Sequence, residues 1–350
     1  MSIKIVQFLH SGKEYKRSEF IKKGEKTIKP WNTGDHRRKF LHAKGAYVDA
    51  GKIIGKENNW EDIYFWGEWE PESIVPNINK HGEDAPPHFI HEPFLRLNES
   101  KQLIKRDKKS IAKNTDPFVF GDKGFFYSCC KQNRKYKDKI YSTQMQDLEP
   151  GSIILFGSNI NHNKGNAYFA LDTVFVVGDD KNKDNPNKQG YNINSYSKKL
   201  TKVPDNYFGI MNFEGWKDSL NSPCNSNEKN DRKGLDCTSI KSKSEGCENG
   251  SDFTCYRGAS FDHRVNGMYS FVPCKIGSKG ENGFERVKLT KDTFQKISKK
   301  AIISYNQCQG VKYSETNNIK DNFDFWKNLR DYIIGEGYYE AVRLDYTEEK

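Results

Sequence analysis

Three carboxylates have the types and positions of acid–base or metal-binding groups. Glu68 and Glu70 end the run DIYFWGEWE, and side chains two apart on a strand point to the same face. Such a pair suits metal binding or general acid–base catalysis. Asp172 lies inside the apolar run AYFALDTVFVV, where a buried carboxylate needs a partner or a function. We therefore nominate Glu68, Glu70 and Asp172 as candidate catalytic residues. The alternative for the pair is an exposed strand end that forms ion pairs with basic residues.

A basic segment near the N-terminus has the composition of a phosphate-binding site. Residues 11–56 contain thirteen Lys and Arg against five Asp and Glu. Guanidinium groups bind phosphate in a forked geometry, and aromatic rings stack on bases. The alternative is an ordinary charged turn beside two core aromatics. The candidate phosphate- or nucleic-acid-binding residues are Trp31, His36, Arg37, Arg38, Lys39 and, later in the chain, Arg257.

Histidines and cysteines offer two weaker metal candidates. His81, His88 and His91 lie in a Pro- and His-rich segment, and imidazole nitrogens are ligands for zinc or iron. The alternative is an ordered loop over the core. The cysteines of 224–255 lack any CxxC spacing, so a mobile polar insertion over residues 222–252 is favoured over a zinc knuckle. No cofactor is predicted, and zinc is kept as an alternative.

The elements that must position these residues are mostly strands. Aromatic residues are 13% of the chain within a hydrophobic share of 35%, which favours an aromatic-rich β core over a Leu/Ala helical bundle. We predict an α+β fold with a predominantly antiparallel β-sheet or partly open barrel core and a few peripheral helices. Predicted strands cover 3–9, 45–48, 62–69, 116–120, 124–129, 152–156, 167–177 and 338–346, and predicted helices cover 94–113, 290–304 and 318–334. The Asn266-Gly267 pair predicts a hairpin within 253–275.

The polar stretch 178–190 is the expected boundary between two regions. Residues 1–178 would form a β-rich region with a basic surface, and residues 191–350 an α+β region that contains the insertion. The alternative is that the two regions pack as one continuous unit.

Tyr256-Arg257-Gly258 resembles the first-strand Arg motif of arginine-type ADP-ribosyltransferases. The resemblance covers these three residues, and the Ser-Thr-Ser motif of that family is absent. It implies that Arg257 would hold NAD phosphates, with Ser270 and Glu340 in the roles of the strand serine and the activating glutamate.

Charge and the absence of known motifs limit the function classes. The chain has a formal net charge of +10, which favours a polyanion partner. We expect no signal peptide, and the sequence contains no apolar run long enough to span a membrane, no Walker loop and no GxGxxG. We expect a cytoplasmic nucleic-acid- or nucleotide-interacting accessory protein, prokaryotic or from a phage, for instance of a DNA-modification or defence system. The alternatives are an enzyme acting on a nucleotide or nucleic acid, and a protein-interaction subunit without a catalytic role. The oligomeric state stays open.

Overall fold

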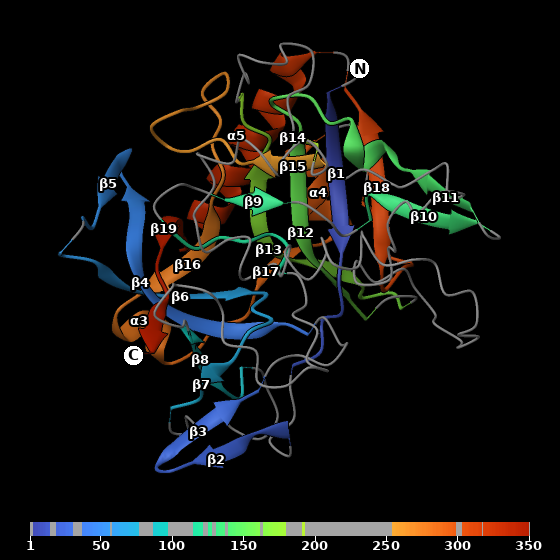
Figure 1. Cartoon of the computed structure of the whole chain (residues 1–350). Helices are drawn as coiled ribbons and strands as arrows, with labels where there is room; N and C mark the ends of the chain where they lie inside the picture. The colour runs from blue at the N-terminus through green and yellow to red at the C-terminus, as the bar shows by residue number, and fades with distance from the viewer. Residues whose placement is uncertain are drawn as a thin grey trace.

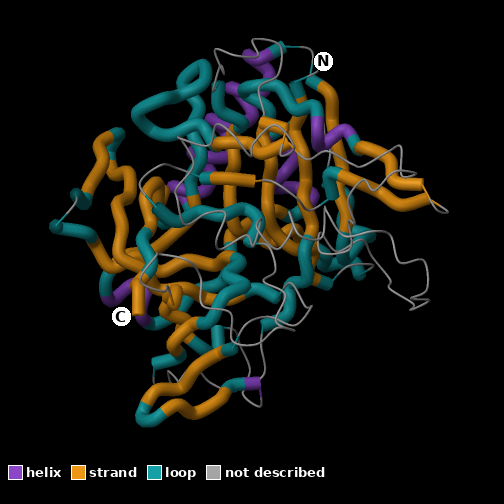
Figure 2. Tube along the Cα trace, in the orientation of Figure 1, coloured by secondary structure: helices purple, strands orange, loops and turns teal. Residues whose placement is uncertain are grey.

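A computed structural model of the chain describes the parts of the sequence that build the β core (Figures 1 and 2). The described residues are 3–14, 19–30, 37–56, 58–76, 87–96, 115–121, 125–127, 131–136, 139–161, 164–179, 191–192, 254–298, 303–316 and 318–349. Strands dominate this part of the chain, as the orange segments of Figure 2 show.

A five-stranded sheet forms the centre of the molecule. Its order is β17-β13-β12-β1-β18, and β1 pairs parallel with β12 but antiparallel with β18. The strands are β1 (Lys4–Leu9), β12 (Ile153–Ile160), β13 (Tyr168–Val176), β17 (Val287–Leu289) and β18 (Gly310–Glu315). All six residues of β1 are buried, because helices cover one face of the sheet and other strands cover the opposite face.

The helical layer comes from two amphipathic helices near the C-terminus. They are α4 (Lys291–Ile297) and α5 (Ile319–Gly335), capped by the side chains of Thr290 and Asn318, which accept hydrogen bonds from backbone N–H groups of the first turn. Apolar residues of α5 such as Trp326 and Leu329 join one buried cluster with alternate residues of β1, Ile5 and Leu9.

The opposite face of the sheet packs against a small closed barrel. The strands β4 (Lys39–Asp49), β6 (Glu61–Gly67), β16 (Val272–Ile276) and β19 (Tyr339–Leu344) pair in a ring, because β19 bonds both β16 and β4. Val6 and Phe8 of β1 share a second buried cluster with Leu41 and Phe65 of this ring. The ring belongs to a ten-stranded sheet.

The remaining strands extend this framework. Added to the ring are β2 (Ile21–Lys23), β3 (Lys26–Lys29), β5 (Lys52–Ile54), β7 (Ser73–Ile74), β8 (Ile90–Arg96) and β20 (Thr347–Glu349). A three-stranded sheet contains β9 (Phe126–Tyr127), β14 (Tyr191–Asn192) and β15 (Thr254–Arg257), and β10 (Asn133–Tyr136) pairs with β11 (Lys139–Ser142). The short elements η2 (Gln144–Gln146) and α3 (Ser278–Glu281) complete the description. In Figure 1 the β2–β3 hairpin projects at the bottom and the β10–β11 hairpin at the right.

The predicted fold class is confirmed: the protein is α+β, mostly antiparallel and rich in aromatic clusters. Both large sheets combine strands from the two expected regions, 1–178 and 191–350. No helix in the described part of the chain is long and apolar enough to cross a membrane. The polar insertion at 222–252 lies outside the described residues.

One local prediction was wrong and a second is confirmed only in part. Residues 94–96, predicted to start a helix, belong to β8, since pairing with β4, β7 and β20 outweighs the local helical pattern; residues 97–114 lie outside the described ranges. The Asn266-Gly267 turn exists, with positive φ at both residues, and Val265 and Met268 form an antiparallel bridge across it, but β15 and β16 do not extend that pairing. β15 pairs with β9 and β14, whereas β16 pairs with β6 and β19.

Candidate functional site

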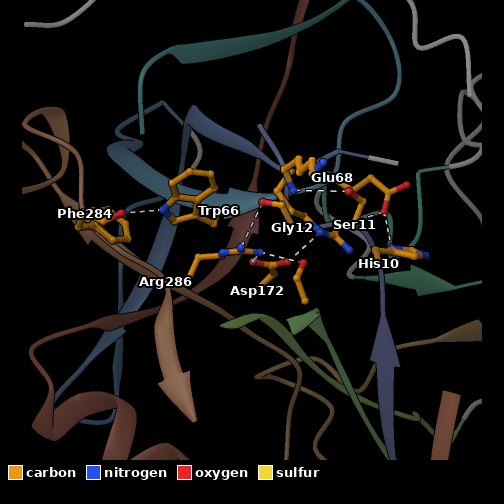
Figure 3. A network of polar contacts seen from close by, with 11 residues as sticks. His10, Ser11, Gly12, Trp66, Glu68, Asp172, Phe284 and Arg286 are labelled. Atoms are coloured by element: carbon orange, nitrogen blue, oxygen red, sulfur yellow. Dashed lines mark hydrogen bonds and ion pairs between the residues drawn. The ribbon is translucent and has the colours of Figure 1, made fainter. Parts of the chain in front are cut away.

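Five ionisable side chains meet where the barrel touches the five-stranded sheet (Figure 3). We call this group the ionic centre; it consists of His10, Arg38, Glu68, Asp172 and Arg286. Strand register explains the meeting. Lys39 pairs with Gly67, so Arg38 and Glu68 are the next neighbours beyond the ends of β4 and β6. Leu171 pairs with Val287, so Arg286 comes next to Asp172.

A β-bulge turns Asp172 toward the centre. Phe156 pairs with Thr173 and Gly157 pairs with Leu171, so Asp172 is the extra residue of β13. The bulge reverses which residues of β13 face the helices. Leu171 and Val174 are three residues apart and would face opposite sides of a regular strand, yet both pack in the buried cluster that contains the apolar residues of α5. A bulge changes the direction of side chains and is frequent next to functional sites.

Arg38 is the middle of the ionic centre. Its Nε lies 3.0 Å from Asp172 Oδ2, and its Nη1 donates to Glu68 Oε2 at 3.1 Å. The same Glu68 oxygen lies 2.8 Å from His10 Nδ1. The side chains of Arg38, Glu68 and Asp172 are at most 1% exposed, so these charges are screened far less than surface charges. Arg38 Nη2 is buried and has no hydrogen-bond partner among the described residues.

Arg286 closes the centre on the other side. Its Nη1 donates to Ser158 Oγ at 3.0 Å and lies 3.4 Å from Asp172 Oδ1, while Nη2 donates to the Gly12 carbonyl at 3.5 Å. Its guanidinium lies 5.5 Å from the centre of the Trp66 ring, within cation–π range. Figure 3 shows Arg286 between Trp66 and Asp172.

Beside the ionic centre lies a second buried group, the lysine cluster, made of Lys29, Lys39, Glu70, Glu72 and His91. Burial, then the charge of Lys29, lowers the pKa of Lys39 to about 7, although Glu70 and Glu68 act in the opposite direction. Burial also lowers the pKa of Lys29 to about 8. Lys39 Nζ donates to the Trp69 carbonyl. At neutral pH a large part of the Lys39 population therefore has a neutral amine.

The predicted metal histidines have separate partners. His88 Nδ1 lies 2.7 Å from Glu14 Oε2. His91 Nδ1 is 2.9 Å from Ser73 Oγ, and burial, then the charges of Lys39 and Lys29, lowers the pKa of His91 well below its usual value. His81 lies outside the described residues, and within them no three His, Cys, Asp or Glu side chains are placed to hold a metal.

The other nominated phosphate-binding residues are dispersed. Arg37 Nη1 donates to Glu19 Oε1 at 2.7 Å, and both side chains are partly exposed. Trp31 and His36 lie outside the described residues. Arg257 is half-buried in β15, and its carbonyl accepts from Gly178 N at 2.8 Å, just beyond the end of β13.

The residues of the ADP-ribosyltransferase resemblance have structural partners. Ser270 Oγ accepts from Val176 N at 2.9 Å. Glu340 accepts two hydrogen bonds of 2.7 Å from Arg330 and one of 2.9 Å from Tyr269. Glu340 is thereby bound to a guanidinium on α5, and the pKa of Tyr269 is raised by burial and by the charge of Glu340.

An exposed cation–aromatic pair lies in the β10–β11 hairpin. Arg134 and Tyr141 are opposite each other in the β10–β11 hairpin, and the guanidinium lies 6.0 Å from the ring centre. Arg134 is exposed, and Tyr141 is 41% exposed. Such a pair offers a ring face and a positive charge to solvent together.

Sequence reasoning nominated Arg38, Glu68 and Asp172 separately and missed His10 and Arg286. Neither missed residue belongs to a recognisable sequence motif. Each lies one position outside a strand, His10 after β1 and Arg286 before β17. The alternative interpretation of Glu68 was an exposed ion pair with the basic segment. Glu68 does pair with Arg38 of that segment, but the pair is buried and not exposed. The break in the alternation of β13 is the sequence signal that marks Asp172.

Comparison with known proteins adds no relative: the chain matches no protein-family model, no curated protein and no solved structure.

Proposed function

We propose that this protein binds nucleic acid or nucleotides, and that single-stranded nucleic acid engages the β10–β11 hairpin. The observation that carries the proposal is the exposed Arg134–Tyr141 pair. Tyr141 is one of two large hydrophobic side chains that the described part of the chain leaves exposed. A base stacks on an exposed tyrosine ring, and the adjacent guanidinium binds the phosphate.

The charge of the chain agrees with such a partner. The net charge is +10, and Lys22 and Lys26 of the β2–β3 hairpin are also exposed. By contrast, Arg38 and Lys39 are buried, so they are unsuited to a first encounter with a polyanion. Surface cations attract nucleic acid over a distance and make binding depend on salt.

The test is a salt titration with labelled single-stranded DNA, duplex DNA and single-stranded RNA, read by fluorescence anisotropy. We expect the logarithm of the binding constant to fall linearly with the logarithm of salt for single strands, with the slope smaller by about 0.7 in Arg134→Ala. Tyr141→Ala should weaken binding by about 1–3 kcal/mol.

The matched control is Arg264→Ala. Arg264 is an exposed arginine whose guanidinium lies 3.9 Å from the Phe261 ring centre, in a different loop. It should leave affinity and slope unchanged. The proposal fails if no probe binds, if binding does not depend on salt, or if Arg264→Ala weakens binding as much as the hairpin variants do.

A further inference from the structure

The ionic centre has hydrogen-bond donors that its own carboxylates do not use. Arg38 has five N–H groups. Nε and Nη1 face Asp172 and Glu68, whereas the two N–H groups on Nη2 meet no acceptor in the described part of the chain. A buried donor without a partner costs free energy, more so when it is charged. Such a donor is expected to bind an acceptor that is not part of the described chain.

The loop above Arg38 adds more donors. Residues 10–13 follow β1 at the carboxyl end of the parallel β1–β12 pair. Arg38 N donates to the Lys13 carbonyl at 3.2 Å, which places this loop against Arg38. Within the described residues, the amides of Ser11 and Gly12 donate no hydrogen bond.

The unused donors at this place favour an oxyanion over a neutral ligand. Two guanidinium groups face two carboxylates, so these four charges balance, and the preference comes from the free N–H groups of Arg38 and not from net charge. A guanidinium with free N–H groups fits the oxygens of a phosphate or a carboxylate.

We propose that the ionic centre is a binding site for an oxyanion of the phosphate class, which accepts from Arg38 Nη2 beneath the loop of residues 10–13. Loop residues Ser11 and Gly12 are half-buried and Lys13 is exposed, so the loop separates the centre from solvent. This site is distinct from the β10–β11 hairpin and does not depend on nucleic-acid binding there.

The experiment is calorimetric titration of the wild-type chain with inorganic phosphate, pyrophosphate, adenosine monophosphate and acetate, at low and high sodium chloride. We expect the phosphate-class probes to bind saturably, with one site per chain that persists at about 500 mM salt, because buried charges are screened less than surface charges. Phosphate binding that is absent, that vanishes at high salt, or that acetate equals would overturn the proposal.

A substitution of Arg38 tests whether the phosphate site lies in the ionic centre. Arg38→Lys keeps the positive charge but loses the forked donor, and it should reduce phosphate affinity at least tenfold. Arg37→Lys is the matched control, because Arg37 is adjacent and pairs with Glu19 instead. Equal losses in the two variants, or no loss in Arg38→Lys, would refute the assignment. If Arg38→Lys does not fold, nuclear magnetic resonance of the wild-type chain decides the location, because phosphate should shift the guanidinium signals of Arg38 and leave those of Arg37 unchanged.

Discussion

Replacing Asp172 with Asn tests whether the ionic centre holds the two sheets together. The substitution removes a carboxylate that lies 3.0 Å from Arg38 Nε and 3.4 Å from Arg286 Nη1. Loss of one partner of a buried ion pair costs about 3–5 kcal/mol, since the remaining charge stays buried. Asn keeps one acceptor oxygen, so we expect the lower end, about 3 kcal/mol. With an unfolding entropy of about 2.1 cal/mol/K per residue over 350 residues, this corresponds to a fall in Tm of about 4 °C.

The assay is urea unfolding followed by tryptophan fluorescence, with thermal unfolding as a second measurement. The matched control is Asp331→Asn, because Asp331 forms an i,i+4 pair with Lys327 and its side chain is 51% exposed. It should change the free energy of unfolding by less than about 0.5 kcal/mol. If Asp172→Asn is as mild as this control, the centre does not stabilise the fold and the reasoning from burial is refuted.

Three further predictions follow from the packing and burial of the described residues. Gly157→Ala should destabilise the chain by about 1–3 kcal/mol in urea unfolding, because its Cβ would clash with the backbone carbonyl oxygen of Ala170 on the paired strand β13. Gly335→Ala, which meets open space, should be neutral or stabilising. The pKa of Lys39 is about 7 in the folded chain and higher in the unfolded chain, so the unfolded chain binds more protons above pH 7 and stability rises with pH up to about 10; Lys39→Met should flatten this rise, and an unchanged profile would contradict the assignment. Burial raises the pKa of the Cys274 thiol, so peptide mapping after brief alkylation should find the exposed Cys308 modified and Cys274 protected until the chain unfolds.

Elements with a local cause were predictable from the sequence. The apolar runs predicted β1, β12 and β13, and the predicted helix 318–334 matches α5. The predicted helix 290–304 matches α4 only as far as Ile297, because Ser298 is extended. The Asn266-Gly267 pair predicted a tight turn. Partner choice was not predictable, because β1 pairs with strands that begin at residues 153 and 310, and no local pattern encodes such distant contacts.

The residues of the candidate site also differ in how far the sequence alone pointed to them. Asp172 was recognisable from its neighbours, since a carboxylate among apolar residues is conspicuous in a sequence. Arg38 and Glu68 were nominated for different reasons, and only the register of β4 with β6 brings them together. His10 and Arg286 lie next to strand ends, where a histidine or an arginine is ordinary, so their role depends on tertiary structure.

The position of β1 has a consequence for synthesis of the chain. This strand leaves the ribosome before both of its neighbours in the sheet, β12 and β18, the second of which ends at Glu315. At about 5–20 residues per second, β18 appears about 15–60 s after β1. During that interval an edge of β1 remains open to another nascent chain. A message truncated before residue 310 should therefore yield an aggregating product, and chaperone demand should peak before the last strands of the sheet are made.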